Sequence, residues 1–309
     1  MNETCQRART YMYRCARPLE MALFQYHFEH GGREAVVNAL SCYQNADGGF
    51  GHALEADAWN PYSSPIQTWA ATEILREIAW TDEAHPMVRG ILRYLESGAD
   101  FDGHFWARKV RTNNDYPRAP WWTCEDGIAP DGDYNPTVCL AGFLIRFAQK
   151  GSALYSRGCR IAKEAIDQLL GARQADDMHT IANYISLYAY LTDAGETEIV
   201  DLSALKERIA QSASALLTRD TAQWATGYVC RPSQFVLDAT GPFYPAVREL
   251  AAFERDFIRD TQLPDGSWRI SWRWGAYDEE WALSKCWWKG HLIVKNLRFL
   301  RGVCGTIFE

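Results

Sequence analysis

The chain has 309 residues and carries 32 Lys and Arg against 39 Asp and Glu, a net charge of −7. Proteins that bind nucleic acids depend on clustered basic side chains, so this balance argues against a nucleic-acid partner. No stretch approaches about 18 uncharged apolar residues, and the first ten residues lack the apolar core of a signal peptide. We therefore expect a protein without a transmembrane segment, located in the cytoplasm.

Cysteine and aromatic contents set two further expectations. The nine cysteines are an odd number and form no Cys-x-x-Cys pair, so neither a disulfide framework nor a zinc ribbon is indicated. The 13 Trp, 15 Tyr and 13 Phe supply an unusually large aromatic surface. This surface either fills a core or lines a cavity for an apolar, cationic or sugar ligand.

Two kinds of helix are predicted along the chain. Amphipathic segments, typical of solvated outer helices, cover 33–44, 85–97, 156–170, 203–217 and 247–260. Segments that are apolar over most of their circumference, typical of inner helices, cover 11–28, 63–78, 135–148, 178–191 and 279–300, with a sixth inner element near 232–243. This alternation predicts an all-α protein, a single (α/α)6-type barrel or toroid that forms one domain over 1–309.

A recurring turn follows the outer helices. Two copies have Gln, Gly and an aromatic residue at fixed offsets: Gln44, Gly48 and Phe50, and Gln262, Gly266 and Trp268. Weaker copies comprise Tyr94, Leu95, Gly103 and Phe105, then Leu169, Leu170 and Gln174, then Leu217, Thr221 and Trp224. We expect each glycine to permit a tight reversal with positive φ, and each glutamine to bond backbone groups left free at a helix end. The turn thus indicates an architecture rather than a reaction.

At these turns the chain resembles the squalene–hopene cyclase and protein prenyltransferase superfamily, whose hallmark is the QW motif. The inner-helix stretches "IQTWAATEIL" and "EEWALSKCWW" after the first and last copies are also similar to that family. The chain looks most like its short, single-toroid bacterial members, often labelled prenyltransferase-like. The resemblance implies the toroid fold; it does not specify a reaction.

The resemblance also implies where an acid would protonate an alkene, namely at an Asp-x-Asp-Asp motif before an inner helix. In "DYNPT" Asp133 is kept but Asn135 takes the donor position, while "YDEEWA" places Glu279 in the donor position beside Glu280. An amide cannot protonate an alkene, whereas a paired glutamate could. The alternative is that these acids cap helix starts.

Two long loops suggest carbohydrate chemistry instead. "GHALEADAWNPYSS" carries Glu55 and Asp57, and "NNDYPRAPWWTCEDG" carries Asp115. Carboxylates interleaved with tryptophans suit sugar binding and acid–base hydrolysis, although such loops can also simply pack on a barrel mouth. In a toroid the loops that lead into inner helices share one rim, so we expect a common cavity. Its candidate catalytic residues are Glu55, Asp57, Asp115, Asp133, Glu279 and Glu280, and its candidate substrate-binding residues are His52, Trp59, Trp69, Trp121, Trp122, Tyr134, His179 and Trp281.

A metal centre is poorly supported. The family's zinc site needs an Asp-x-Cys pair, which is missing, and Cys286 and His291 lie five residues apart on one helix. We expect no metal and no cofactor. The leading hypothesis is acid-initiated chemistry on an apolar, isoprenoid-type small molecule, with Glu279 or Asp57 as proton donor. The alternatives are a carbohydrate hydrolase or lyase and a non-catalytic ligand-binding toroid.

Overall fold

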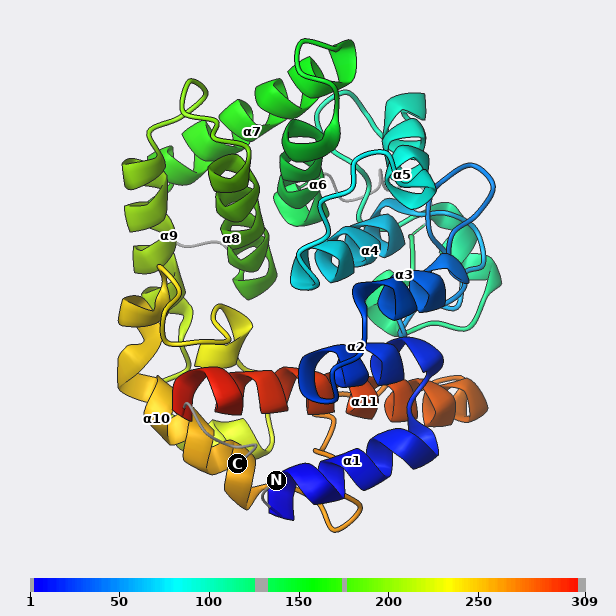
Figure 1. The fold of residues 1–309 in the computed structure, drawn as a ribbon, viewed down its shortest axis with the longest axis vertical. Coiled ribbons are helices and arrows are strands. Elements are labelled where there is room, and N and C mark those ends of the chain that lie inside the picture. The colour runs from blue at the N-terminus through cyan, green and yellow to red at the C-terminus, as the bar shows by residue number, and fades with distance from the viewer. Residues whose placement is uncertain (1–2, 126–132, 174–176, 305–309) are drawn as a thin grey trace. The chain divides into compact units, whose positions relative to one another are not determined.

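The computed structural model describes residues 3–125, 133–173 and 177–304, and the regular secondary structure of these ranges is helical (Figure 1). No β-strand forms within them; only isolated β-bridges occur. The α-helices are α1 (Glu3–Cys15), α2 (Pro18–Phe28), α3 (Arg33–Ser41), α4 (Pro65–Glu77), α5 (Pro86–Ser97), α6 (Tyr134–Phe147), α7 (Ala153–Gly171), α8 (Met178–Asp193), α9 (Leu202–Leu216), α10 (Tyr244–Asp260) and α11 (Asp278–Cys304). The short 3-10 helices are η1 (Arg111–Asp115), η2 (Pro120–Trp122), η3 (Thr221–Ala225) and η4 (Pro232–Gln234). The all-α prediction is confirmed.

The helix starts follow local chemistry. Ser64 caps α4 by accepting a hydrogen bond from the backbone N–H of Gln67, and Pro65 occupies the first helical position, where its missing N–H costs little. The expected inner element near 232–243 is the exception, because only η4 forms there. The Asp238 carboxylate accepts hydrogen bonds from the backbone N–H groups of Thr240 and Gly241, and this turn competes with a helix.

The chain divides into two compact units. Unit 1 comprises residues 1–39 and 210–309, and unit 2 comprises residues 40–209. Each unit is described by itself below. The single domain over 1–309 stays a prediction.

Unit 2 is built around α6. Thirteen of its 14 residues are buried, and it packs against α4, α5, α7 and α8 (Figure 1). By contrast α7 buries one stripe, whose members are Leu154, Gly158, Ile161, Ala162, Ala165, Ile166 and Leu169. The spacing of three and four residues is that of a helix with one solvated face. A helix that is buried almost all round and an amphipathic helix therefore lie side by side, as their sequences predict.

Unit 1 is built around α11. This helix packs against α1, α2 and α10 (Figure 1), and Ile293, Leu297 and Leu300 on it are fully buried. Helices from both ends of the chain therefore share one core.

The glycines of the two strong turn copies have the predicted conformation. Gly48 has a φ of +97° and Gly266 a φ of +89°. A Cβ atom would lie 2.1 Å from the carbonyl oxygen of Gly90 at the first position and 2.1 Å from that of Arg7 at the second. Positive φ and close backbone approach both require glycine here.

The glutamines bond differently from the expectation. Each side-chain amide donates to the carbonyl of its own turn's glycine and to a second carbonyl, that of Met87 for Gln44 and that of Thr4 for Gln262, at 2.9–3.1 Å. Met87 and Thr4 are second residues of α5 and α1. The acceptors thus lie in the first turn of another helix, whereas the expected partners were backbone groups left free at a helix end. Each turn is therefore hydrogen-bonded to a helix outside its own helix–turn segment, α5 for Gln44 and α1 for Gln262.

The aromatic residues complete these turns. Phe50 is fully buried and its backbone N–H donates to Thr68 Oγ1 at 3.1 Å, which joins the turn to α4. Trp268 is buried and its indole Nε1–H donates to the carbonyl of Ile258 at 2.7 Å, which joins the turn to α10. The architectural interpretation of the repeat agrees with these contacts.

In the third copy the ring is one residue later than predicted. Trp106, not Phe105, is fully buried. The backbone N–H of Trp106 donates to Thr137 Oγ1 of α6 at 3.0 Å, in the same way that the backbone N–H of Phe50 donates to Thr68 of α4. Arg160 replaces the missing glutamine by donating to the Gly103 carbonyl at 2.7 Å. One extra residue after the glycine accounts for the shift. Gln174 of the fourth copy lies outside the described residues.

Candidate functional site

The two aromatic loops of unit 2 lie against each other. The backbone N–H of Trp59 donates to the carbonyl of Pro117 at 3.0 Å, and the N–H of Ala119 donates to that of Asp57 at 2.9 Å. Asn60 binds the side chain of Asn113 at 2.9 Å. The structure therefore brings together the loops that carry Glu55, Asp57 and Trp59 and those that carry Asp115, Trp121 and Trp122.

The acids on these loops differ in exposure. Asp57 is only 3% exposed, Glu55 is half-buried and Asp115 is exposed. The Glu55 carboxylate accepts a hydrogen bond from the Asp57 backbone N–H at 3.4 Å. Trp121 is exposed, while Trp59 and Trp122 are half-buried. Of the three acids, Asp57 has the environment most removed from water.

Asp133 combines two structural contacts. Its carboxylate caps α6 by accepting from the N–H of Asn135 at 2.8 Å, and it pairs with Arg108 at 3.1 Å. Both contacts favour the charged carboxylate, as the capping alternative requires. Tyr134 beside it is buried, with its ring 5.0 Å from that of Phe105.

The two predicted histidines lie near helix and turn backbones. His52 is exposed and its Nε2 lies 2.9 Å from Asn45 Oδ1. His179 stands in the first turn of α8, where its backbone N–H donates to the capping carboxylate of Asp177 at 2.8 Å.

The predicted acids of the last inner helix belong to unit 1. Glu279 is exposed and Glu280 half-buried, both in the first turn of α11. Trp281 is buried, with its ring 5.6 Å from that of Trp274. These three residues are thus in one unit and the other candidates in the other.

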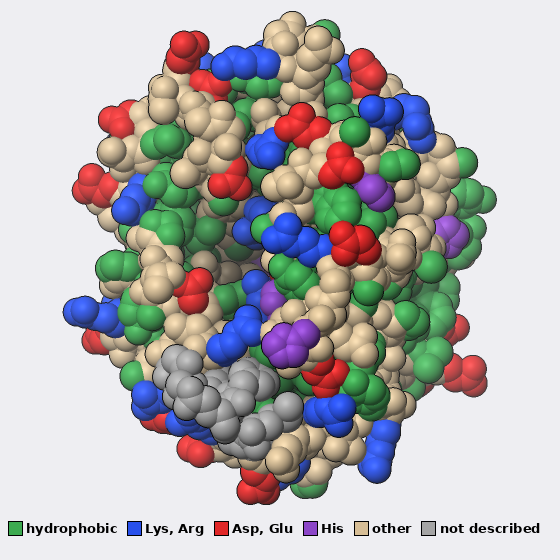
Figure 2. Space-filling view, viewed as in Figure 1, with side chains coloured by type: hydrophobic (Ala, Val, Ile, Leu, Met, Phe, Trp, Pro, Cys, Tyr) green, Lys and Arg blue, Asp and Glu red, His purple; other side chains and the backbone are tan. Residues whose placement is uncertain are grey.

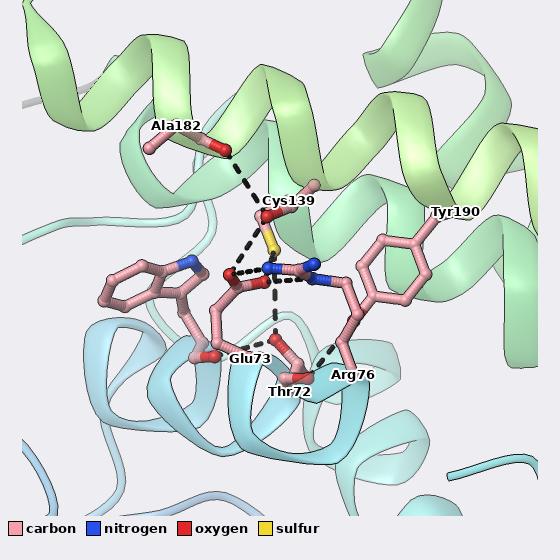
Figure 3. A network of polar contacts seen from close by, with 8 residues as sticks. Thr72, Glu73, Arg76, Cys139, Ala182 and Tyr190 are labelled. Carbon is pink, nitrogen blue, oxygen red and sulfur yellow. Dashed lines mark hydrogen bonds and ion pairs between the residues drawn. The ribbon is translucent and has the colours of Figure 1, made fainter. Parts of the chain in front are cut away.

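A polar network that sequence analysis did not single out joins three helices of unit 2 (Figure 3). On α4, Arg76 donates from Nε and Nη2 to the two carboxylate oxygens of Glu73, at 3.2 and 2.7 Å. From α6 the Cys139 thiol donates to Glu73 Oε1 at 3.1 Å, and from α8 the Ser186 hydroxyl donates to Oε2 at 3.0 Å. Tyr190 on α8 donates to the Thr72 carbonyl at 3.2 Å. One carboxylate therefore fixes the mutual positions of α4, α6 and α8.

The charges of this network are set by their neighbours. Burial raises the pKa of Glu73, but Arg76 and the hydrogen bonds from Cys139 and Ser186 outweigh it and hold that pKa below its ordinary value. Burial, followed by the Glu73 charge, raises the pKa of Cys139 well above its usual value. Near neutral pH the network contains a carboxylate, a guanidinium and a neutral thiol. Cys139 is thus a hydrogen-bond donor and not a thiolate nucleophile.

The ion pair keeps access to solvent. The Arg76 side chain is 33% exposed and that of Glu73 24%. All the hydrogen bonds of Arg76 to described residues leave from Nε and Nη2, so Nη1 keeps its donors for another acceptor. Trp69, one turn earlier on α4, has an indole N–H with no acceptor in the described part of the chain. This arrangement can hold a carboxylate or phosphate at a guanidinium whose orientation is already fixed.

No metal centre is visible in the described ranges, since no group of three or more His, Cys, Asp or Glu side chains there could hold an ion. On the same ranges, no helix has the length and apolar character needed to cross a bilayer. Lys and Arg side chains are interspersed with Asp and Glu on the face drawn in Figure 2.

Comparison with protein-family models, with curated proteins and with solved structures finds no match for this chain. The site must therefore be interpreted from its own chemistry.

Proposed function

We propose that this protein binds a small organic anion through Arg76 in unit 2, on an α/α toroid of the terpenoid cyclase kind. The supporting observation concerns the Arg76 guanidinium. It is held by the Glu73 carboxylate, both of whose oxygens accept hydrogen bonds, and the Arg76 side chain is still one-third exposed. Arginine side chains that recognise a carboxylate or phosphate use a guanidinium of fixed orientation with N–H donors still available.

The rest of the ligand would lie against apolar helices. The helices that carry the network, α4, α6 and α8, contain many aliphatic and aromatic residues beside their polar ones. Sites for small molecules typically combine such walls with a few placed polar groups. The proposed ligand is therefore a mainly apolar molecule with one carboxylate or phosphate group.

Binding by calorimetry tests this proposal. The probes are decanoate and dodecyl phosphate below their micellar concentrations, with decanol as the uncharged counterpart. Arg76→Lys keeps the charge but loses the fork, and we expect about tenfold to a hundredfold weaker binding of the anions, because hydrogen bonds to charged groups contribute about 1.5–3 kcal/mol. Arg89→Lys on the exposed face of α5 is the matched control and should leave affinity unchanged.

Loss of folding must be separated from loss of binding. Arg76→Met alone leaves Glu73 without its counter-ion, so Glu73→Leu with Arg76→Met removes both charges together; such replacements are often neutral for stability. We expect this double variant to fold and not to bind the anions. Anion binding by the folded double variant, or equal affinity for decanol, would overturn the proposal.

We further propose acid-initiated chemistry on an apolar isoprenoid, with Asp57 as the donor, as a second candidate. The observation that favours Asp57 is its burial beside the paired tryptophan-bearing loops. Incubation with squalene and analysis of products by mass spectrometry should show cyclised alkenes that Asp57→Asn abolishes and Glu279→Gln does not. Turnover of oligosaccharides lost in Asp57→Asn would instead favour the carbohydrate alternative.

A further inference from the structure

A small pocket lies between α1 and the turn that follows α10, both of which belong to unit 1. Its volume is about 290 Å³, close to the lower end of the usual range for small-molecule sites, about 300–1,000 Å³. The residues that form its walls include Arg7, Tyr11, Arg14, Cys15, Pro264 and Asp265. Arg7, Tyr11 and Arg14 follow one another at intervals of four and three residues, so they share one face of α1. One helix face and one turn therefore form the pocket.

Arg7 is held in the pocket wall by a neutral side chain. Its Nε and Nη2 both donate to Gln262 Oε1, at 3.1 and 2.7 Å. Gln262 is itself fixed, because its amide group donates to the carbonyls of Thr4 and Gly266, both at 2.9 Å. An amide oxygen orients the guanidinium without cancelling its charge. All the hydrogen bonds of Arg7 to described residues leave from Nε and Nη2, so Nη1 keeps its donors for an anion.

The charges of the pocket walls do not cancel. Asp265 already pairs with Lys289 at 2.9 Å and accepts from the Ser267 hydroxyl at 2.6 Å. Arg14 is exposed and forms no ion pair or hydrogen bond with any residue that the structure describes. The pocket thus keeps the positive charges of Arg7 and Arg14, in a chain whose net charge is −7. Charge complementarity favours a ligand with about two negative charges.

The wall residues also offer apolar contact area. Tyr11 is only 5% exposed. Its hydroxyl donates to the Cys286 carbonyl at 3.5 Å, and the Lys289 ammonium lies 5.5 Å from its ring centroid, so the ring is fixed in place. Pro264 lies on the turn side of the pocket. An aromatic ring and a proline ring beside two arginines suit a small ring that carries the negative charge.

We propose that this pocket binds the phosphate monoester of a small aromatic molecule. Such a phosphate carries about −1.5 to −2 charge at pH 7 and offers three acceptor oxygens. In this assignment the phosphate accepts from Arg7 Nη1 and pairs with Arg14, while the ring of the ligand lies against Tyr11 and Pro264. Arg14 is about 10 Å from Arg7 along the helix axis, and its exposed side chain is free to turn toward the phosphate. The site belongs to unit 1 and is independent of the function proposed for Arg76.

The thiol of Cys15 makes occupancy measurable. Cys15 is exposed in the pocket wall, whereas Cys42 is an exposed thiol of unit 2. The full chain is labelled with limiting N-ethylmaleimide at increasing concentrations of phenyl phosphate, and the rate at each cysteine is measured by peptide mass spectrometry. At ten times Kd the free fraction of the site falls about tenfold. We therefore expect labelling of Cys15 to slow at least fivefold and that of Cys42 to stay unchanged.

Two shortened probes separate the ring from the phosphate. Phenol lacks the phosphate and inorganic phosphate lacks the ring. For both we expect half-protection of Cys15 at a concentration at least fivefold above that of phenyl phosphate, because each loses one set of contacts. Equal slowing at Cys15 and Cys42, or equal protection by phenol, would overturn the proposal.

A pair of variants on α1 tests the arginines. Arg14→Gln removes a side chain without partners among the described residues, so it should leave the fold intact and raise the half-protection concentration about tenfold or more. Arg9→Gln removes the same charge outside the pocket walls, from an exposed pair with Glu29, and should leave that concentration unchanged. Protected and unprotected rates are compared within each variant, which cancels any change in the intrinsic reactivity of Cys15. Unchanged protection in Arg14→Gln, or equal weakening in both variants, would overturn the assignment.

Discussion

At the scale of the residue, Glu73 shows how one side chain can serve both stability and binding. Its two oxygens accept four hydrogen bonds, from Arg76, Cys139 and Ser186. Glu73→Gln keeps the shape but removes the charge, so Arg76 loses its counter-ion. We expect the free energy of unfolding to fall by no more than about 3 kcal/mol at pH 7, the upper range for hydrogen bonds to a charged group, because the pair is partly exposed. Urea titration measures it.

The same residue predicts a pH dependence. The pKa of Glu73 in the folded chain lies below its ordinary value, so its contribution is present above the pKa of an unfolded glutamate, about 4.3. It is lost as the pH falls through the lower, folded pKa. The difference in the free energy of unfolding between wild type and Glu73→Gln should therefore become smaller at acid pH. Glu164→Gln, in an exposed pair with Arg160, should cost less than about 1 kcal/mol; equal losses for both variants would contradict this interpretation.

At the scale of the element, the two glycine turns are the features most open to a direct test. Gly48 and Gly266 each have positive φ, and a Cβ atom at either position would lie 2.1 Å from a carbonyl oxygen. The variants Gly48→Ala and Gly266→Ala therefore introduce both backbone strain and a steric clash. Gly151 also has positive φ but open space around its Cβ position, so Gly151→Ala isolates the conformational cost, about 1 kcal/mol. We expect the other two variants to lose at least about 2 kcal/mol. Equal losses in all three would show that the close backbone approach does not matter.

Sequence patterns predicted these elements better than the site. The periods of apolar residues in α7 and α6 distinguish a one-sided helix from one buried all round. Glu73 and Arg76 were missed because an i,i+3 acidic–basic pair within "ATEILREI" has the same pattern as a solvated helix face. Cys139 and Ser186, which single out that pair, are distant in the chain. In the third turn the spacing from glycine to ring predicted Phe105, whereas the buried ring is that of Trp106. A fixed spacing cannot detect one inserted residue.

At the scale of the whole molecule, the chain order and the compact units do not coincide. Residues 1–39 and 210–309 form unit 1 together, and Gln262 reaches the first helix, where its side chain binds Thr4 and Arg7. Such contacts cannot be read from local periodicity, because they join segments more than 250 residues apart. The alternation of outer and inner helices in the sequence supplied the expectation of one toroid, and that expectation makes a thermodynamic prediction.

If the predicted single domain over 1–309 is right, both units should unfold in one cooperative transition. We expect differential scanning calorimetry to show one peak whose calorimetric and van't Hoff enthalpies agree. Gly48→Ala lies in unit 2 and Gly266→Ala in unit 1, so each should move the entire peak to lower temperature. Their combined effect on the free energy of unfolding should be nearly additive, because the two turns share no partner. Two peaks, each shifted by one variant alone, would show instead that the units are independent domains, because a glycine turn can only destabilise the cooperative unit to which it belongs.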